Sequence, residues 1–458
     1  MQQLADILAQ GQSQWPNKVA VADASRSLTY GELALGAQCI AGWLIAQGVA
    51  PGDRVAIRLP NSVRFVETFF GVQWAGAVTT PLDPAMPEAQ FRAIVKRAEP
   101  KVVLDAQSPW EDIFSAAPLG EAVNRAPDDL ASLMFTTGTT GQPKGVMLTQ
   151  ANVLTALQNI TEFVGYTPAD REVITLPLSH NFGLGHMLCN LLCGGAVYLE
   201  PGMSRVGRVL KAIESFGATG FPTTPLGVSL LLDRYREVFV ERAQGLRFMV
   251  VNSAPLPPER AAELQAALPD LNVLVYYGLT EASRSTYISL TEAGPDRYGS
   301  VGQPMNAVDL KIADTGEVLI GGPTVTPGYW CDDELTQATL PNGVLHTGDL
   351  GHLDGDGYLY ITGRADDIIN LGGYKINPLQ VERVLEQFTG VAEAAVVGKG
   401  EVCAYYVATE ELDADVLTKH CRTQLQVYET PQRYIRIDAL PRTDSGKLKR
   451  QELRQAGD

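Results

Sequence analysis

The chain has 458 residues, about three times the roughly 150 residues of a common domain, so one very large domain or two to three linked domains are expected. Hydrophobic residues make up 45% of the chain and charged residues 19%, a balance that excludes a disordered or fibrous protein. The 36 Lys and Arg against 52 Asp and Glu give a formal net charge of −16, which argues against nucleic acid as a partner.

Targeting patterns and cysteine usage together predict a cytoplasmic protein. No run reaches the roughly 18 uninterrupted apolar residues of a membrane span, and the first residues lack the basic-then-apolar pattern of a secretory signal. The six cysteines are scattered, which is typical of reduced thiols. His186, Cys189 and Cys193 have helical spacing, but their neighbours are apolar, so a packed helix is favoured over a metal site.

The first 330 residues alternate short apolar runs with amphipathic stretches, the pattern of an α/β fold. A helix is predicted over 30–47, because Thr29 and Glu32 have the spacing of a capping box and Gly48 suits the C-terminal cap. Other strands are predicted within 19–22, 55–59, 173–178, 195–199, 247–251 and 273–277, and helices within 61–75 and 257–268.

The sequence changes character after residue 340. Residues 344–361 predict a strand, a turn at Asp354–Gly357 and a second strand. From about residue 367 a basic, compact segment follows, with a helix predicted near 378–388 and strands at 391–397 and 402–407. This segment is expected to form a small second domain.

An apolar strand ending at Phe135 leads into a loop of hydroxyls, glycines and one lysine. Glycines let backbone N–H groups approach phosphate oxygens, threonines donate hydrogen bonds and the lysine adds a mobile charge. The polyphosphate of ATP needs that combination, and the residues predicted to supply it are Thr136, Thr137, Gly138, Thr139, Thr140, Gly141 and Lys144. Gly145 follows the lysine where a Walker A loop has Ser or Thr, so a P-loop fold is disfavoured.

This loop resembles that of the adenylate-forming superfamily, which includes acyl-CoA synthetases, standalone adenylation domains and firefly luciferase. Four more segments resemble the family's motifs in order: Tyr277–Glu281, His346–Asp349, Gly363–Asp367 and Pro441–Lys447. The resemblance spans residues 15 to 450 and is greatest to AMP-forming acyl- or aryl-CoA ligases. It implies an α/β fold: a large multi-subdomain N-terminal domain (1–363) with layered sheets and helices, a hinge (364–366) and a small α+β C-terminal domain (367–458).

The resemblance also implies roles for individual residues in ATP binding. Tyr277 would stack on adenine, Asp349 and Arg364 would bind the ribose, and Thr280 would hold a phosphate oxygen. Mg²⁺ would be held by Glu281 and Thr139. Further residues implied at the nucleotide are Ser253, Ala254, Pro255, Tyr276, Gly278 and Tyr360.

The chemistry that the resemblance implies needs two conformations. Lys447 would act as the catalytic lysine of adenylation, together with Thr280, Glu281 and His180. Rotation about Asp366 would then bring Gly372, Gly373, Tyr374 and Lys375 to line a tunnel for the thiol. The acyl pocket would be formed by His180, Asn181, Phe182, Asn252, Gly278, Leu279 and Ala282.

The identity of the acid and of its acceptor is less constrained. Amino-acid-activating relatives place an acidic residue near Asn181, and this position is neutral, so an acyl or aryl acid without an α-amino group is expected. CoA is favoured as the acceptor. The alternatives are a standalone adenylation enzyme that loads an acid or amino acid onto carrier-protein phosphopantetheine, and a non-catalytic nucleotide sensor.

Overall fold

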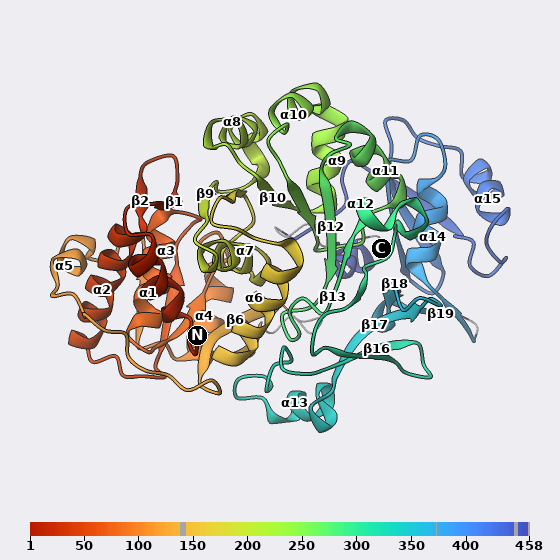
Figure 1. Cartoon of the computed structure of the whole chain (residues 1–458). Coiled ribbons are helices and arrows are strands. Elements are labelled where there is room, and N and C mark those ends of the chain that lie inside the picture. The colour runs from red at the N-terminus through yellow and green to blue at the C-terminus, as the bar shows by residue number, and fades with distance from the viewer. Residues whose placement is uncertain (138–142, 372, 444–447, 457–458) are drawn as a thin grey trace. The chain divides into compact units, whose positions relative to one another are not determined.

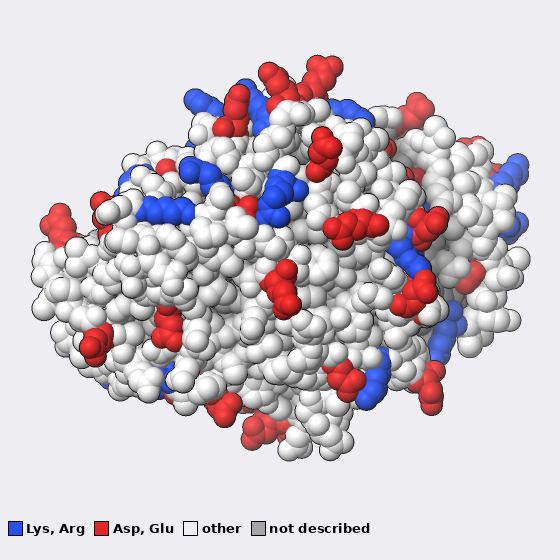
Figure 2. Space-filling model, in the orientation of Figure 1, with Lys and Arg blue, Asp and Glu red and all other residues white. Residues whose placement is uncertain are grey.

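The computed structural model describes residues 1–137, 143–371, 373–443 and 448–456. They fall into two compact units, the first comprising Met1–Leu310 and Ile320–Leu345, the second Lys311–Leu319 and His346–Asp458. Among the described helices, none is long and apolar enough to cross a membrane. Figure 2 shows acidic and basic side chains interspersed on one face of the molecule.

The largest sheet of the first unit has nine strands in the order β14-β13-β12-β11-β10-β8-β9-β1-β2 (Figure 1). Its centre, from β12 to β1, is parallel, and β2, β13 and β14 add antiparallel edges. In that order the strands are Gln303–Pro304, Thr286–Ser289, Asn272–Tyr277, Phe248–Val251, Gly220–Thr223, Arg171–Ile174, Ala196–Leu199, Val19–Ala22 and Ser27–Thr29.

A second sheet of the first unit has the order β5-β3-β4-β6-β7. Its strands are Val102–Asp105, Arg54–Arg58, Val78–Pro81, Leu130–Thr137 and Pro143–Thr149. The first four are parallel, whereas β7 runs antiparallel to β6. Because β7 follows β6 in the chain, the phosphate-loop sequence begins on one of these paired strands and ends on the other.

The helices of the first unit cover these sheets. They are α1 Ala5–Gln14, α2 Tyr30–Ala46, α3 Val63–Trp74, α4 Glu88–Ala98, α5 Trp110–Ser115, α6 Gln150–Val164, α7 Asn181–Leu192, α8 Val206–Phe216, α9 Pro225–Arg234, α10 Arg236–Arg242, α11 Pro258–Ala267, α12 Leu290–Ala293 and α13 Asp333–Thr339, with 3₁₀ turns at Met203–Arg205, Pro295–Arg297 and Pro341–Gly343. The predicted capping box of α2 is confirmed, since Thr29 and Glu32 satisfy each other's backbone N–H groups.

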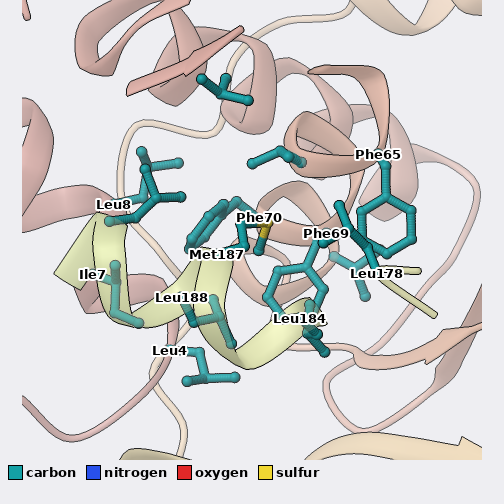
Figure 3. Close-up of a cluster of buried hydrophobic side chains, with 14 of the residues drawn as sticks. Leu4, Ile7, Leu8, Phe65, Phe69, Phe70, Leu178, Leu184, Met187 and Leu188 are labelled. Carbon is teal, nitrogen blue, oxygen red and sulfur yellow. The ribbon is translucent and has the colours of Figure 1, made fainter. Parts of the chain in front are cut away.

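The apolar core of the first unit forms where α7 packs on β8 and β9 and against α1 and α6. Leu184, Met187 and Leu188 of α7 meet Leu4 and Phe69 there (Figure 3). These apolar contacts fix α7 against the core, and its first turn lies at one wall of the pocket described below.

The second unit contains three small sheets, in the orders β15-β16-β17-β18, β19-β20 and β21-β22-β23. Their strands are Asp309–Ile312, Glu317–Gly321, Leu345–Leu353, Leu359–Arg364, Ile369–Leu371, Tyr374–Ile376, Glu393–Gly398, Val402–Val407 and Arg433–Ile437. The helices are α14 Pro378–Glu386, α15 Ala414–Arg422 and α16 Arg450–Gln455, and a 3₁₀ turn spans Ala365–Asp367. The predicted hairpin within 344–361 is confirmed by the antiparallel pair β17 and β18.

The predicted fold class is confirmed: a large α/β N-terminal domain with several sheets is followed by a small C-terminal domain of mixed composition. The hinge at 364–366 stays a prediction.

Candidate active site

The strand pair β6 and β7 presents the lysine of the phosphate-loop sequence. Thr136 lies opposite Lys144 in the ladder, and Thr137 lies opposite Pro143. Lys144 is half-buried, and no hydrogen bond or ion pair holds its ammonium among the residues that the structure describes. The other predicted phosphate ligands, Gly138, Thr139, Thr140 and Gly141, lie outside the described residues.

A tight loop joins β12 to β13 and contains the predicted Thr280 and Glu281. Backbone N–H groups of Leu279 and Ser285 donate to the carbonyl oxygens of Ala282 and Tyr277, at 3.0 and 2.8 Å. A Cβ atom on Gly278 would lie 2.4 Å from the backbone nitrogen of Arg284, so only glycine fits where the two backbone segments approach so closely. The loop thus holds the residues after Tyr277 in one compact turn.

Glu281 is held by a tyrosine from another segment of the first unit. The Tyr329 hydroxyl donates to Glu281 Oε1 at 2.9 Å, and the Glu281 carbonyl accepts from the Thr326 N–H at 2.7 Å. Burial first, and then the charge of Glu281, raises the pKa of Tyr329, so this phenol stays a donor. In the described part of the chain Glu281 Oε2 has no hydrogen-bond partner, which leaves one oxygen available to a ligand.

Adjacent tyrosines of β12 point to opposite faces of the sheet, as side chains alternate along a strand. Tyr277 is half-buried. Tyr276 is 4% exposed, and its ring packs against Phe182 and Tyr287, with ring centroids 5.5 and 5.8 Å apart. Burial raises the pKa of Tyr276, while the charge of Arg284 and a hydrogen bond to Asn252 oppose that rise.

The predicted acyl-pocket residues gather around the start of α7. His180 is exposed and precedes the helix, and half-buried Asn181 and Phe182 form its first turn. The structure brings Phe182 and Asn252 together at the Tyr276 ring. Leu279 is half-buried and Ala282 is fully buried in the loop after β12.

The sequence reasoning missed Arg284, whose guanidinium reaches the same region. Its Nη2 donates to the Asn181 carbonyl at 3.2 Å and its Nη1 to Ser283 Oγ at 2.6 Å. Arg284 is only 2% exposed and adopts a left-handed backbone with φ +59°. The available signal was a charged residue inside the short, otherwise uncharged segment from Ala282 to Leu290.

A pocket of about 10 Å³ opens beside Arg284. The described residues that line it are Leu4, Phe69, Ser132, Leu148, Asn152, Val153, Ala156, Leu157, Asn181, Leu184, Gly185, Leu188, Ser283, Arg284 and Thr324. Arg284 is the one charged side chain among them. The walls are otherwise apolar or neutral, so a charged group entering the pocket would meet a single fixed positive charge.

The loop after β11 contains the predicted adenine residues Ser253, Ala254 and Pro255. Ser253 has φ +92°, a conformation that non-glycine residues rarely adopt. Ala254 and Pro255 are exposed. A strained residue beside an exposed loop is common where a backbone is shaped for a ligand.

In the second unit, the two predicted ribose ligands lie side by side. Asp349 of β17 faces Arg364 of β18 in the ladder, and Nη1 of Arg364 donates to Asp349 Oδ1 at 2.8 Å. Asp349 is 8% exposed and Arg364 is exposed. Tyr360, also predicted at the nucleotide, stacks on His352 with centroids 5.3 Å apart.

The remaining predicted residues of the second unit are exposed or outside the described residues. Asp366 is exposed, with its Oδ2 4.0 Å from Arg364 Nη2. Gly373, Tyr374 and Lys375 are exposed at the β19 and β20 hairpin. Gly372 and Lys447 lie outside the described residues.

The helix with His186, Cys189 and Cys193 is a packed one. His186 Nδ1 lies 3.0 Å from Glu172 Oε1, and the Tyr166 hydroxyl donates to the same oxygen at 2.9 Å. Burial raises the pKa of the Cys189 thiol and of Cys193, the latter to about 11, so neither is a ready thiolate ligand. Within the described ranges no group of three or more His, Cys, Asp or Glu could hold a metal ion.

Comparison with known proteins agrees with this geometry. Residues 8–330 match the family model described as AMP-binding enzyme, and residues 380–447 match that of the AMP-binding enzyme C-terminal domain. A sulfoacetate–CoA ligase of Cupriavidus necator is 31% identical, covering 98% of this chain and 97% of that protein. A feruloyl-CoA synthase of an Amycolatopsis species is 32% identical, covering 96% of each.

The structures of o-succinylbenzoate CoA synthetase from Bacillus subtilis are also similar. The complex with the acyl-adenylate intermediate has a TM-score of 0.88 at 28% identity and covers 99% of this chain and 98% of that one. The complex with ATP and magnesium ion has a TM-score of 0.86 at 28% identity and covers 98% of both chains.

The fold, the phosphate-loop sequence and the loop that contains Glu281 define an adenylate-forming enzyme. The chain belongs to the AMP-binding enzyme family, and it is an AMP-forming acid–thiol ligase.

Proposed function

We propose that this ligase activates a small carboxylic acid as its acyl-adenylate and passes the acyl group to the thiol of CoA. A carboxylate oxygen attacks the α-phosphorus of ATP, the bond to the bridging oxygen breaks, and pyrophosphate leaves. The CoA sulfur, having lost its proton, then attacks the acyl carbon, and AMP leaves with the oxygen. The observation that carries the proposal is the Glu281 carboxylate, oriented by Tyr329 with one oxygen available.

The chain's own groups can bind the phosphates on the first unit. Lys144 is supported as a phosphate ligand by its place in the β6 and β7 ladder, opposite Thr136, and because the one acid that its charge acts on in the described structure, Asp332, is already paired with Arg97. We propose that Thr137, Gly138, Thr139, Thr140 and Gly141 complete this cradle. Thr280, in the turn after β12, is proposed to donate to a phosphate oxygen.

Glu281 suits the magnesium ion that the family implies. A hard cation prefers carboxylate oxygens, and Tyr329 fixes one oxygen of Glu281 while leaving the other without a partner in the described chain. We propose Glu281 and Thr139 as its protein ligands. When bound, Mg²⁺ supplies neutralising charge on the phosphate oxygens.

The nucleoside ligands are proposed from each unit's own geometry. In the first unit Tyr277, Gly278 and the Ser253–Pro255 loop are proposed at adenine, supported by the strained φ of Ser253. In the second unit Asp349 is proposed to accept from the ribose hydroxyls, with Arg364 holding its carboxylate. Tyr276 and Tyr360 are proposed as supporting residues around these ligands.

The acyl pocket is proposed to take an acid without an α-amino group. It would be formed by His180, Asn181, Phe182, Asn252, Gly278, Leu279 and Ala282, with His180 also gating the reacting group. In the described lining of the adjoining pocket Arg284 is the one charged side chain, so an ammonium there would be repelled and would lack a carboxylate partner.

The second unit is proposed to serve both half-reactions. Lys447 would neutralise charge on the acid and the α-phosphate, and rotation at Asp366 would bring Gly372, Gly373, Tyr374 and Lys375 to the thiol path. Domains of 1–363 and 367–458 joined at 364–366 suit this scheme.

The test is acid-dependent exchange of labelled pyrophosphate into ATP across a panel of carboxylic acids, followed by addition of CoA. We expect exchange with at least one acid, and then AMP and acyl-CoA in equal amounts. Lys447→Ala should slow adenylation by about 10²–10³-fold, because it removes a preorganised donor. Lys449→Ala is the matched control, since Lys449 is an exposed lysine paired with Glu452.

The outcome also separates the alternatives. ATP binding without exchange for any acid would indicate a nucleotide sensor and would overturn the proposal. Exchange followed by acyl transfer to a phosphopantetheinylated carrier protein, but not to CoA, would make the chain a standalone adenylation enzyme. Exchange with free amino acids in preference to other acids would overturn the proposed substrate class.

A further inference from the structure

Arg284 is a buried cation whose hydrogen bonds are incomplete. Two of its donors reach Ser283 Oγ and the Asn181 carbonyl, whereas Nε is buried and has no hydrogen-bond partner in the described structure. Its guanidinium lies 5.6 Å from the centroid of the Tyr276 ring. Because guanidinium stays protonated at any working pH, this site holds a permanent positive charge.

The described part of the chain supplies no carboxylate to Arg284 within ion-pair distance. Glu172, a fully buried acid on β8, is already bound by Tyr166 and His186. A buried charge without a counter-ion is costly, so an anionic ligand that paired with Arg284 would relieve that cost.

A second residue with a buried, unpartnered polar atom lines the same pocket. Thr324 Oγ1 is buried with no hydrogen bond in the described structure, and Thr324 and Arg284 both line the 10 Å³ pocket. The lining also includes the apolar side chains of Leu184, Leu188 and Phe69, which belong to the core cluster in Figure 3. A hydroxyl and a guanidinium in apolar surroundings are donors suited to an anion.

The helix α7 is shaped to admit the guanidinium. A Cβ atom on Gly185 would lie 1.7 Å from Arg284 Nη2, so only glycine leaves the space that Arg284 occupies. Glycine inside a helix lowers helix stability by roughly 0.5–1 kcal/mol relative to alanine. The space for the arginine side chain therefore comes with a lower stability of α7.

We propose that Arg284 is a specificity-determining residue that binds a second anionic group, a carboxylate or sulfonate, at the far end of the acid substrate. The inference rests on the proposed function and narrows its substrate to short acids with two acidic groups. The guanidinium offers planar paired donors to that group, and Thr324 Oγ1 adds a third. The pocket is near the least volume that holds one water, so its lining must widen to take even a carboxylate, and a long chain or a second ring is excluded.

The experiment compares acids that differ in one charge only. Malonate, succinate and glutarate are each paired with their monoamides, and kcat/KM is measured by pyrophosphate release with CoA present. We expect wild-type protein to prefer the best diacid over its monoamide by about 10²-fold, the value of hydrogen bonds to a charged group. Arg284→Gln should remove that preference, mainly through KM, and should change the monoamide rates by less than about threefold.

Three further variants separate recognition from folding. Thr324→Val removes a hydroxyl without a partner, so it should fold and should lower only the diacid rates, by about three- to tenfold. Arg284→Lys should retain part of the preference. Arg92→Gln, at an exposed ion pair with Glu88, is the matched control and should change neither rate.

Every result of this experiment bears on the inference. Equal rates for diacid and monoamide in wild-type protein would overturn it while the proposed function stands. An equal loss for both acids in Arg284→Gln would show that the arginine only holds the loop against α7. If Arg284→Gln fails to fold, the wild-type ratio and Thr324→Val decide. Absence of pyrophosphate release with all acids would instead overturn the proposed function.

Discussion

Each unit contains an arginine with little exposure, Arg284 at 2% and the Arg450 side chain at 14%, and the two have opposite surroundings. In the second unit, Arg450 Nη2 donates to Glu382 Oε2 at 2.8 Å, its Nη1 contacts Glu382 Oε1, and its Nε lies 3.1 Å from Asp367 Oδ2. In the first unit, Arg284 has no acid within ion-pair distance in the described structure and keeps one nitrogen without a partner.

This difference distinguishes a structural charge from one reserved for a ligand. Burial alone lowers the pKa of Arg450, but the hydrogen bonds and charge of Glu382, followed by Asp367, raise it overall. The folded chain thus satisfies Arg450 by itself. Arg284 donates hydrogen bonds only to a hydroxyl and a carbonyl oxygen, and neither carries a charge. Its positive charge is therefore balanced only when an anion enters the pocket.

The largest expected effect is on the second unit. Arg450→Met leaves the Glu382 carboxylate, 6% exposed, without its counter-ion, which should cost about 3–5 kcal/mol of local stability. Hydrogen exchange of the amides in β21 and β22, measured in the full-length protein, reports this loss. A loss below about 1 kcal/mol would contradict the structural role of Arg450.

The next largest effect is the stability that the second unit regains when Arg450 and Glu382 are both replaced. The double variant Arg450→Met with Glu382→Leu should lose less stability than the two single variants lose in sum, by about 1–3 kcal/mol. The reason is that this pair then leaves no unpaired charge. The four proteins of this cycle are compared by the same exchange measurement. Strict additivity would mean that the two side chains do not interact.

Arg284→Met should behave differently from Arg450→Met. Removing a buried charge that has no counter-ion should change the stability of the first unit by less than about 1 kcal/mol, or raise it. Urea denaturation followed by tryptophan fluorescence measures the change. A loss of about 3 kcal/mol or more would show that Arg284 is already satisfied in the free protein.

Salt should give the smallest effect. Raising NaCl from about 0.1 to 1 M should weaken the Arg450–Glu382 pair little, because partly buried pairs are poorly screened. The same change should raise KM for a diacid about two- to threefold more than KM for its monoamide, since the incoming anion is attracted from solvent. Equal salt dependence of the two KM values would argue against an anion site at Arg284.

The sequence predicted the local elements well, since local signals determine them. Thr29 and Glu32 place the start of α2, and Asp354–Gly357 places the turn between β17 and β18. The strand order of the nine-stranded sheet was not predicted, because it depends on packing between segments such as β1 and β9, which are far apart in the chain.

The candidate site was predicted in part for a similar reason. Motif order was enough to propose Asp349 and Arg364, and the structure places them in direct contact. Arg284 was missed because its importance comes from burial, and its burial depends on α7 passing close by at Gly185. The uncharged segment around residue 284 makes the arginine stand out, but it does not indicate that α7 passes close to it.

The glycine at position 185 has a consequence for altering the enzyme. A methyl group there would push the guanidinium away from the helix, so Gly185→Ala offers a way to retune acid choice from the opposite wall without touching the arginine. A chain redesigned toward acids with a single acidic group would therefore need two coordinated changes. One is a larger residue at position 185 of the helix, and the other is a neutral side chain at position 284.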